Sequence, residues 1–174
     1  HHLHFTADDY AEKGNFIKCN PAIKAAHNKE AFWKALLDGR LDVIATDHAP
    51  HTFEEKNGPY LKAHAGLPLV QHSLPLMLHY HFLGKISLEK IAEKMSHAVA
   101  DCFGIKERGY IREGYFADVV IINPQKFFNV TKENILYKCG WSPLEGFTFP
   151  ASISHTFVNG NLVYGNGEWN ESYK

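Results

Sequence analysis

The segment from Asp47 to His51 carries the side chains best suited to chemistry. It follows the apolar run at 41–46, which is typical of a strand buried on both faces of a parallel sheet. Catalytic residues of β/α barrels lie at the carboxyl ends of such strands. Because an unpaired buried carboxylate is costly, we expect Asp47 to meet a cation, a metal or several donors. A turn or helix-capping aspartate explains the spacing equally well.

Two further polar side chains accompany this segment. His51 lies four residues after Asp47, where it is a candidate second metal ligand, a substrate contact or an ordinary loop residue. Asn20 follows the run at 16–19 and is expected to end another strand, with an amide that can both donate and accept hydrogen bonds. Before Pro21, however, a turn residue is the more common role of an asparagine.

The elements that must position these groups follow from the periodicity of apolar residues. A helix is predicted over 29–37, with Gly39 placed as its C-terminal cap, and a strand over 41–46. Residues 52–68 contain breakers and predict a long loop of the kind that is usually functional. Further helices are predicted over 74–83, from the Ser87 cap to about Met95, and from a Ser96 cap to near Gly104.

The pattern changes beyond Arg112 to short strand-like runs. These runs occupy 117–122, 153–158 and 162–164, and Asn159-Gly160 predicts a type I′ hairpin turn between the last two. The sequence therefore predicts an α/β chain, with a β/α half followed by a small antiparallel β unit.

Composition limits the partners. A chain of 174 residues with a formal net charge of −1 has no basic stripe for nucleic acid and no cationic face for a membrane. The three cysteines are widely spaced without a CxxC pair, which favours neither a disulfide framework nor a thiolate zinc site. We therefore expect a cytoplasmic protein with a small-molecule or protein partner. Of the twelve histidines, most are expected to be surface or packing residues.

Residues 44–51, followed by Glu54-Glu55-Lys56, resemble the most distinctive signature of the dihydroorotases, which are zinc-dependent cyclic amidohydrolases. The likeness extends along nearly the whole chain, through motifs at 1–3, 18–21, 114–118 and 141–146. At 1–3 the pair of histidines fits the end of the family's preceding barrel strand better than a remnant of a purification tag.

The resemblance implies a role for each candidate residue. Asp47 matches the aspartate that binds zinc and moves a proton during catalysis. His51 matches the histidine that contacts the substrate carboxylate, and Asn20 matches the asparagine that holds the polar edge of the ring. Ala65 and Gly66 match the loop that presents backbone groups to the ring.

The resemblance also implies the architecture and the reaction. Residues 1–108 would form the C-terminal part of a (β/α)8 TIM-type barrel, and 109–174 a share of a small β-sandwich domain. The reaction would be the reversible hydrolysis of dihydroorotate to N-carbamoyl-L-aspartate in pyrimidine biosynthesis. A full barrel needs about 250 residues, so the missing N-terminal half must supply most ligands of a binuclear Zn²⁺ site. We expect the isolated chain to bind zinc poorly, to be inactive, and to pair with its missing half; a homodimer is a further candidate assembly.

Departures from the family pattern keep two alternatives open. Ala22 and Lys24 stand where a proline and an arginine are common, and Lys24 lacks the planar fork that grips a carboxylate. The usual glutamate near Gln71-His72 is also replaced. The alternatives are a cyclic amidohydrolase resembling dihydropyrimidinase or allantoinase, and a non-catalytic homologue that serves as a scaffold.

Overall fold

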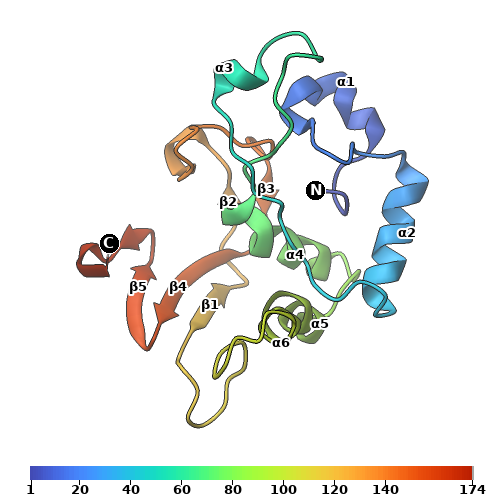
Figure 1. The fold of residues 1–174 in the computed structure, drawn as a ribbon. Helices are drawn as coiled ribbons and strands as arrows, with labels where there is room; N and C mark the ends of the chain where they lie inside the picture. Colours follow the sequence, from blue (N-terminus) through green and yellow to red (C-terminus); the bar gives the residue numbers. More distant parts are fainter. Residues whose placement is uncertain (174) are drawn as a thin grey trace. The chain divides into compact units, whose positions relative to one another are not determined.

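The chain divides into two units in the computed structural model, which describes residues 1–173 (Figure 1). The first unit contains the segments 1–41, 45–74 and 129–147. The second contains 42–44, 75–128 and the described residues from Thr148 onward. All five residues expected to bind substrate or metal, namely Asn20, Asp47, His51, Ala65 and Gly66, belong to the first unit.

Three α-helices lie in the first unit. Helix α1 (Tyr10–Lys13) stands between two 3-10 turns, α2 spans Ala26–Leu37, and α3 spans Phe53–Lys56 within the long loop. The predicted helix over 29–37 is confirmed and begins three residues earlier. Gly39 follows it with a φ of 86°, the left-handed conformation expected after a helix end.

One face of α2 holds the first four residues of the chain. The indole Nε1 of Trp33, which is 1 % exposed, donates to the carbonyl of Leu3 at 2.9 Å. Lys29 Nζ donates to the carbonyl of His4 at 3.3 Å, and the ring of Phe32 stacks on His2 with centroids 5.6 Å apart. Residues 29, 32 and 33 share a helix face, so a single surface of α2 positions this segment.

The strands predicted over 41–46 and 16–19 are wrong for this chain. Neither run is assigned as a strand, and the second ends a 3-10 turn at Ile17. A strand requires hydrogen bonds to a neighbouring strand, and no such neighbour lies beside these runs within residues 1–173. What remains near Asp47 is a single parallel bridge between His48 and Leu67.

The segment 129–147 is tied to the residues after the long loop by one amide side chain. The Nε2 of Gln71 donates to the carbonyl of Asn134 at 2.7 Å, and its Oε1 accepts from the backbone of Leu136 at 2.9 Å. The backbone N–H of Gln71 donates to the hydroxyl of Tyr137 at 3.1 Å. Gln71 thus has a structural role here.

A buried histidine completes this connection. His72 is 0 % exposed, and its Nδ1 lies 3.2 Å from the hydroxyl of Tyr137 and 3.3 Å from the hydroxyl of Ser142. Burial lowers the pKa of His72 to about 4 and raises the pKa of Tyr137. At neutral pH the ring of His72 is therefore uncharged.

The helices of the second part of the chain follow in quick succession. Helix α4 spans Ser73–Phe82, which confirms the predicted helix over 74–83. Ser87 caps α5 (Leu88–Ala92) by accepting from the backbone of Lys90 at 3.2 Å. The predicted Ser96 cap is wrong, because Ser96 lies inside a π-helical turn that continues into α6 (Ala98–Cys102). No helix within residues 1–173 is long and apolar enough to cross a bilayer.

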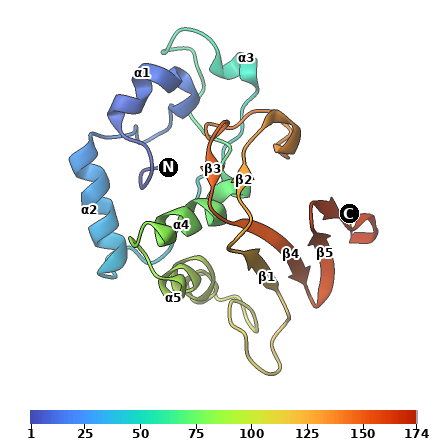
Figure 2. The same cartoon turned by 180° about the vertical axis from the view of Figure 1, so that it is seen from behind.

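Four antiparallel strands form the main sheet, in the order β1-β4-β5-β6. Figure 2 labels β1, β4 and β5. Their bounds are Val119–Asn123, Ser152–Val158, Asn161–Gly165 and Glu168–Trp169. Asn159 and Gly160, at φ values of 53° and 78°, make the tight turn between β4 and β5. The three predicted strands and their hairpin are confirmed. A second, two-stranded sheet pairs β2 (Phe128–Asn129) with β3 (Thr148–Phe149).

Neutral His72 predicts a specific loss of stability in acid. Its pKa is 6.5 when unfolded and about 4 when folded, so the unfolded chain binds the additional proton as the pH falls through this interval. The stabilisation is complete above pH 6.5 and declines toward pH 4, by about 3 kcal/mol at most. Chemical denaturation of the full-length protein between pH 4 and 7 measures this slope.

Two variants provide the comparison. His72→Asn keeps an acceptor near the Tyr137 hydroxyl but does not titrate, so its unfolding free energy should vary less with pH over the same interval. His27→Asn, at an exposed position of α2, should retain the parent slope. An equal pH dependence of the unfolding free energy in the parent and in His72→Asn would show that His72 does not cause the loss of stability in acid.

Candidate functional site

Two histidines and a cysteine bring potential metal ligands together. One ligand atom from each of His1, His2 and Cys19 lies within 4.8 Å of the other two. The Nδ1 of His1 and both ring nitrogens of His2 are buried without a hydrogen bond to any other residue that the structure describes. Buried polar atoms nearly always have partners, so a group of orphaned nitrogens marks a place for a ligand.

The carboxylate of Asp47 acts electrostatically on this cluster. Burial lowers the pKa of His2, and the negative charge of Asp47 opposes that shift. Burial also raises the pKa of Cys19, and Asp47 adds to that rise. Asp47 itself is exposed and has a φ of 47°, a left-handed conformation that aspartate tolerates better than most residues.

The residue after Asp47 anchors this turn. The Nδ1 of His48 accepts from the backbone of Leu69 at 3.0 Å, and its ring lies 5.3 Å from that of Tyr137. The backbone N–H of Ala49 donates to the carbonyl of Leu67 at 3.1 Å. The contacts of His48 and Ala49 therefore hold the backbone that follows Asp47, although no strand leads into it.

The donor set fits a divalent metal. The group of His1, His2 and Cys19 offers imidazole nitrogen and a thiol, and imidazole and thiolate are ligands that Zn²⁺ takes in proteins. The sequence analysis does not single out His1 and His2 as candidate ligands, although adjacent histidines at an expected strand end were a usable signal. Cys19 is also missed, because the fold rather than a CxxC spacing brings its thiol to the histidines.

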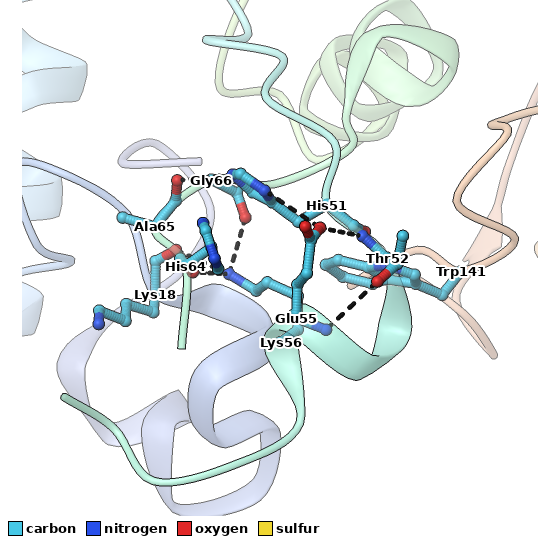
Figure 3. Close-up of polar contacts among 9 residues, drawn as sticks. All are labelled: Lys18, His51, Thr52, Glu55, Lys56, His64, Ala65, Gly66 and Trp141. Atoms are coloured by element: carbon cyan, nitrogen blue, oxygen red, sulfur yellow. Dashed lines mark hydrogen bonds and ion pairs between the residues drawn. The ribbon is translucent and has the colours of Figure 1, made fainter. Parts of the chain in front are cut away.

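His51 lies in the adjoining loop with both ring nitrogens engaged (Figure 3). Its Nε2 donates to the carbonyl of Ala65 at 3.2 Å, and its Nδ1 lies 3.5 Å from a carboxylate oxygen of Glu55. The indole of Trp141 donates to the backbone carbonyl of His51 at 2.8 Å and holds the segment in place. To bind a substrate carboxylate, the ring of His51 must release either the carbonyl of Ala65 or the carboxylate of Glu55.

Gly66 packs tightly against the segment that carries Asp47. Its φ is 146°, and a Cβ at this position would lie 2.5 Å from the carbonyl oxygen of Ala49. The backbone N–H of Gly66 donates to the carbonyl of Lys18 at 2.9 Å. Only glycine permits this approach, which places residues 65 and 66 against both the segment at 47–51 and the segment at 18–20.

Asn20 is exposed and lies between the group of His1, His2 and Cys19 and the loop at Gly66. The preceding residue, Cys19, belongs to the group with His1 and His2, and Lys18 binds the loop at Gly66. The structure thus joins His51 to Ala65 directly and relates Asp47 to the Asn20 segment through Cys19. The catalytic and substrate-binding roles of these residues stay predictions.

Curated proteins similar to this chain include dihydroorotases and allantoinases. A dihydroorotase of Halobacterium salinarum is 37% identical over 166 residues, which cover 94% of this chain and 39% of that relative. An allantoinase of Desulfitobacterium hafniense is 31% identical over 169 residues, with 97% and 38% covered. The chain therefore spans about two fifths of the length of these relatives.

Solved structures agree on the fold. The L-hydantoinase (dihydropyrimidinase) of Arthrobacter aurescens superimposes with a TM-score of 0.90 at 29% identity and covers 97% of this chain, which matches 39% of that one. The D-hydantoinase of a Thermus species has a TM-score of 0.86 at 20% identity, over 97% of this chain and 38% of that one. The model of the Amidohydrolase family matches residues 1–163. Because this match covers most of its length, the chain belongs to the amidohydrolase family.

Proposed function

We propose that the protein containing this chain is a dihydroorotase, which hydrolyses dihydroorotate reversibly to N-carbamoyl-L-aspartate in pyrimidine biosynthesis. The observation that carries the proposal is the charge of the loop cluster in Figure 3. The side chains drawn there include the ammonium groups of Lys18 and Lys56, the imidazoles of His51 and His64 and the carboxylate of Glu55. Such a cluster favours a ring that bears a carboxylate, as dihydroorotate does, over a neutral ring.

The buried nitrogens of His1 and His2 and the carboxylate of Asp47 would hold Zn²⁺, with the thiol of Cys19 beside them. A bound zinc ion lowers the pKa of a water molecule and polarises the amide carbonyl. The remaining ligands would come from residues outside this chain, in a TIM-type barrel to which residues 1–108 contribute. Residues 109–174 would contribute to the small β domain. The full-length protein would be cytoplasmic, and a homodimer is one assembly to test.

Asp47 would move the proton that ring opening requires. Its carboxylate accepts a proton from the attacking water and delivers it to the amide nitrogen that leaves. In ring closure the same group works in the opposite direction. Its exposure leaves the carboxylate accessible to substrate, while the contacts of His48 keep its backbone in place.

A second candidate is hydrolysis of a neutral cyclic amide, as the names of the allantoinase relatives and the L-hydantoinase structure suggest. One observation favours it: both ring nitrogens of His51 already have partners, Ala65 and Glu55. If these contacts persist in the complex, His51 cannot take a substrate carboxylate. The substrate profile of the protein distinguishes the two activities.

The role of Asp47 predicts the effect of one amide substitution. Asp47→Asn keeps the size of the side chain and the tolerance of a positive φ but cannot carry the proton. We expect kcat of the full-length enzyme to fall by about 100-fold or more, with little change in thermal stability. Asp42→Asn, at another exposed position, is the matched control and should leave kcat unchanged. Retained turnover in Asp47→Asn would remove Asp47 from the mechanism.

The role of His51 predicts a change in selectivity. Dihydroorotate, hydantoin and allantoin are assayed with the parent and with His51→Asn. The parent should prefer dihydroorotate, and the variant should lose about tenfold in kcat/KM for that anion, because one contact to its carboxylate is lost. The neutral substrates should be affected less. A parent that turns over only hydantoin or allantoin would replace the proposed function with the second candidate.

A further inference from the structure

A buried lysine lies at the centre of the loop that carries the expected substrate contacts. Lys56 ends the short helix α3 and is 0 % exposed, although lysine is almost never fully buried without a partner. Its Nζ donates to three backbone carbonyls, those of Lys18 at 3.1 Å, His64 at 2.9 Å and Gly66 at 2.8 Å. An ammonium group has three N–H donors, and all three are used.

No carboxylate forms an ion pair with Lys56 within residues 1–173. Carbonyl dipoles and the ring of Trp141, with its centroid 6.0 Å from Nζ, surround the charge instead. Dipoles satisfy the hydrogen-bond donors but do not cancel the charge. The ammonium of Lys56 therefore keeps a positive charge beside the segment of Asn20.

The three carbonyls belong to two segments that the proposed function places around the substrate. Lys18 is two residues before Asn20, while residues 64 and 66 flank Ala65. Because Lys56 binds the carbonyls on both sides of Ala65, the intervening carbonyl turns elsewhere, and it accepts from Nε2 of His51 at 3.2 Å. Figure 3 shows this arrangement, with Lys56 reaching between the two segments.

We propose that Lys56, as an ammonium ion, is a positioning residue that fixes the peptide orientations at 64–66 and holds them against 18–20, thereby setting the affinity for the substrate. The effect on substrate affinity rests on the proposed function, whereas the effect on the peptide orientations does not. In this proposal Lys56 does not contact the substrate. It acts through the backbone at 64–66, which does. Its removal should therefore change KM more than kcat.

The protonation state of Lys56 makes its hydrogen bonds to the three carbonyls sensitive to pH. A neutral amine has only two N–H donors and cannot serve three carbonyls. Burial lowers the pKa of Lys56 to about 8; Lys18 lowers it further, and Cys19 opposes the shift. The ammonium thus holds all three carbonyls at neutral pH and begins to release one as the pH rises through 8. KM for dihydroorotate should rise across this interval.

The test compares three variants with the parent, each as the full-length, metal-loaded protein. Lys56→Met removes the donors but keeps the apolar stem, and Lys56→Arg keeps the charge without the tetrahedral donors. Lys62→Met, an exposed lysine of the same loop, is the matched control. KM and kcat for dihydroorotate are measured from pH 6.5 to 9.5, together with zinc content and hydrogen exchange at the amide of Gly66, which donates to Lys18.

We expect Lys56→Met to raise KM by about tenfold, with a much smaller change in kcat and unchanged zinc content. Its KM should no longer rise above pH 8, and the Gly66 amide should exchange faster. Lys62→Met should match the parent in every measurement. If Lys56→Met does not fold, Lys56→Arg carries the test, with the same rise in KM and faster exchange expected.

Two results would overturn the inference. Unchanged KM and unchanged Gly66 exchange in a folded Lys56 variant would show that the carbonyls hold their orientation without the ammonium. A loss of stability with KM, its pH profile and exchange unaffected would reduce Lys56 to a packing role. Hydrogen exchange needs no substrate, so a parent inactive toward dihydroorotate would refute the proposed function while exchange still decides whether Lys56 positions the loop.

Discussion

The cost of burying the ammonium of Lys56 constrains the long loop and the segment at 18–20. A desolvated cation is tolerated only when its donors are satisfied, and here the three acceptors come from the backbone at 18, 64 and 66. Residue 18 precedes Asn20, and residues 64 and 66 flank Ala65. The hydrogen bonds that satisfy the buried ammonium therefore also orient the peptide groups of the loop. Gly66 completes the arrangement, because any side chain there would collide with Ala49 in the segment after Asp47.

A second constraint acts on the ligand cluster. His1 and His2 are placed by α2, whose Trp33 and Lys29 bind the carbonyls of Leu3 and His4. Their orphaned nitrogens then meet the thiol of Cys19, one residue before Asn20. The segment at 18–20 therefore connects the candidate metal ligands to the candidate substrate loop. In the proposed mechanism this connection would let a bound ring be held beside the ion and the carboxylate of Asp47.

Local signals in the sequence predicted the elements that local interactions form. The helix with Gly39 after it, the Ser87 cap and the Asn159-Gly160 hairpin depend on neighbouring residues, and the structure confirms them. The strand over 41–46 failed because a strand depends on neighbours that a periodicity does not reveal. Ser96 failed as a cap because the helix continues through a π-helical turn. The barrel and the boundary after residue 108 stay predictions.

The candidate site divides in the same way. Asp47, His51 and Asn20 were found through motifs, and the structure brings His51 into contact with Ala65, while the roles of all four stay predictions. His1, His2 and Cys19 were not assigned as ligands, since their proximity is created by the fold across segments distant in sequence. Lys56 was part of the quoted motif but was given no role, because residue spacing does not reveal that its side chain is buried or that three carbonyls accept from it.

The most direct test of the central claim is a crystal structure of the full-length protein with zinc and dihydroorotate, using anomalous scattering to locate the metal. The account predicts a zinc ion about 2 Å from a carboxylate oxygen of Asp47 and from a ring nitrogen of His1 or His2, with the substrate carboxylate at His51 and the 65–66 backbone. A zinc ion bound away from these side chains, or a substrate carboxylate turned away from His51, would contradict it.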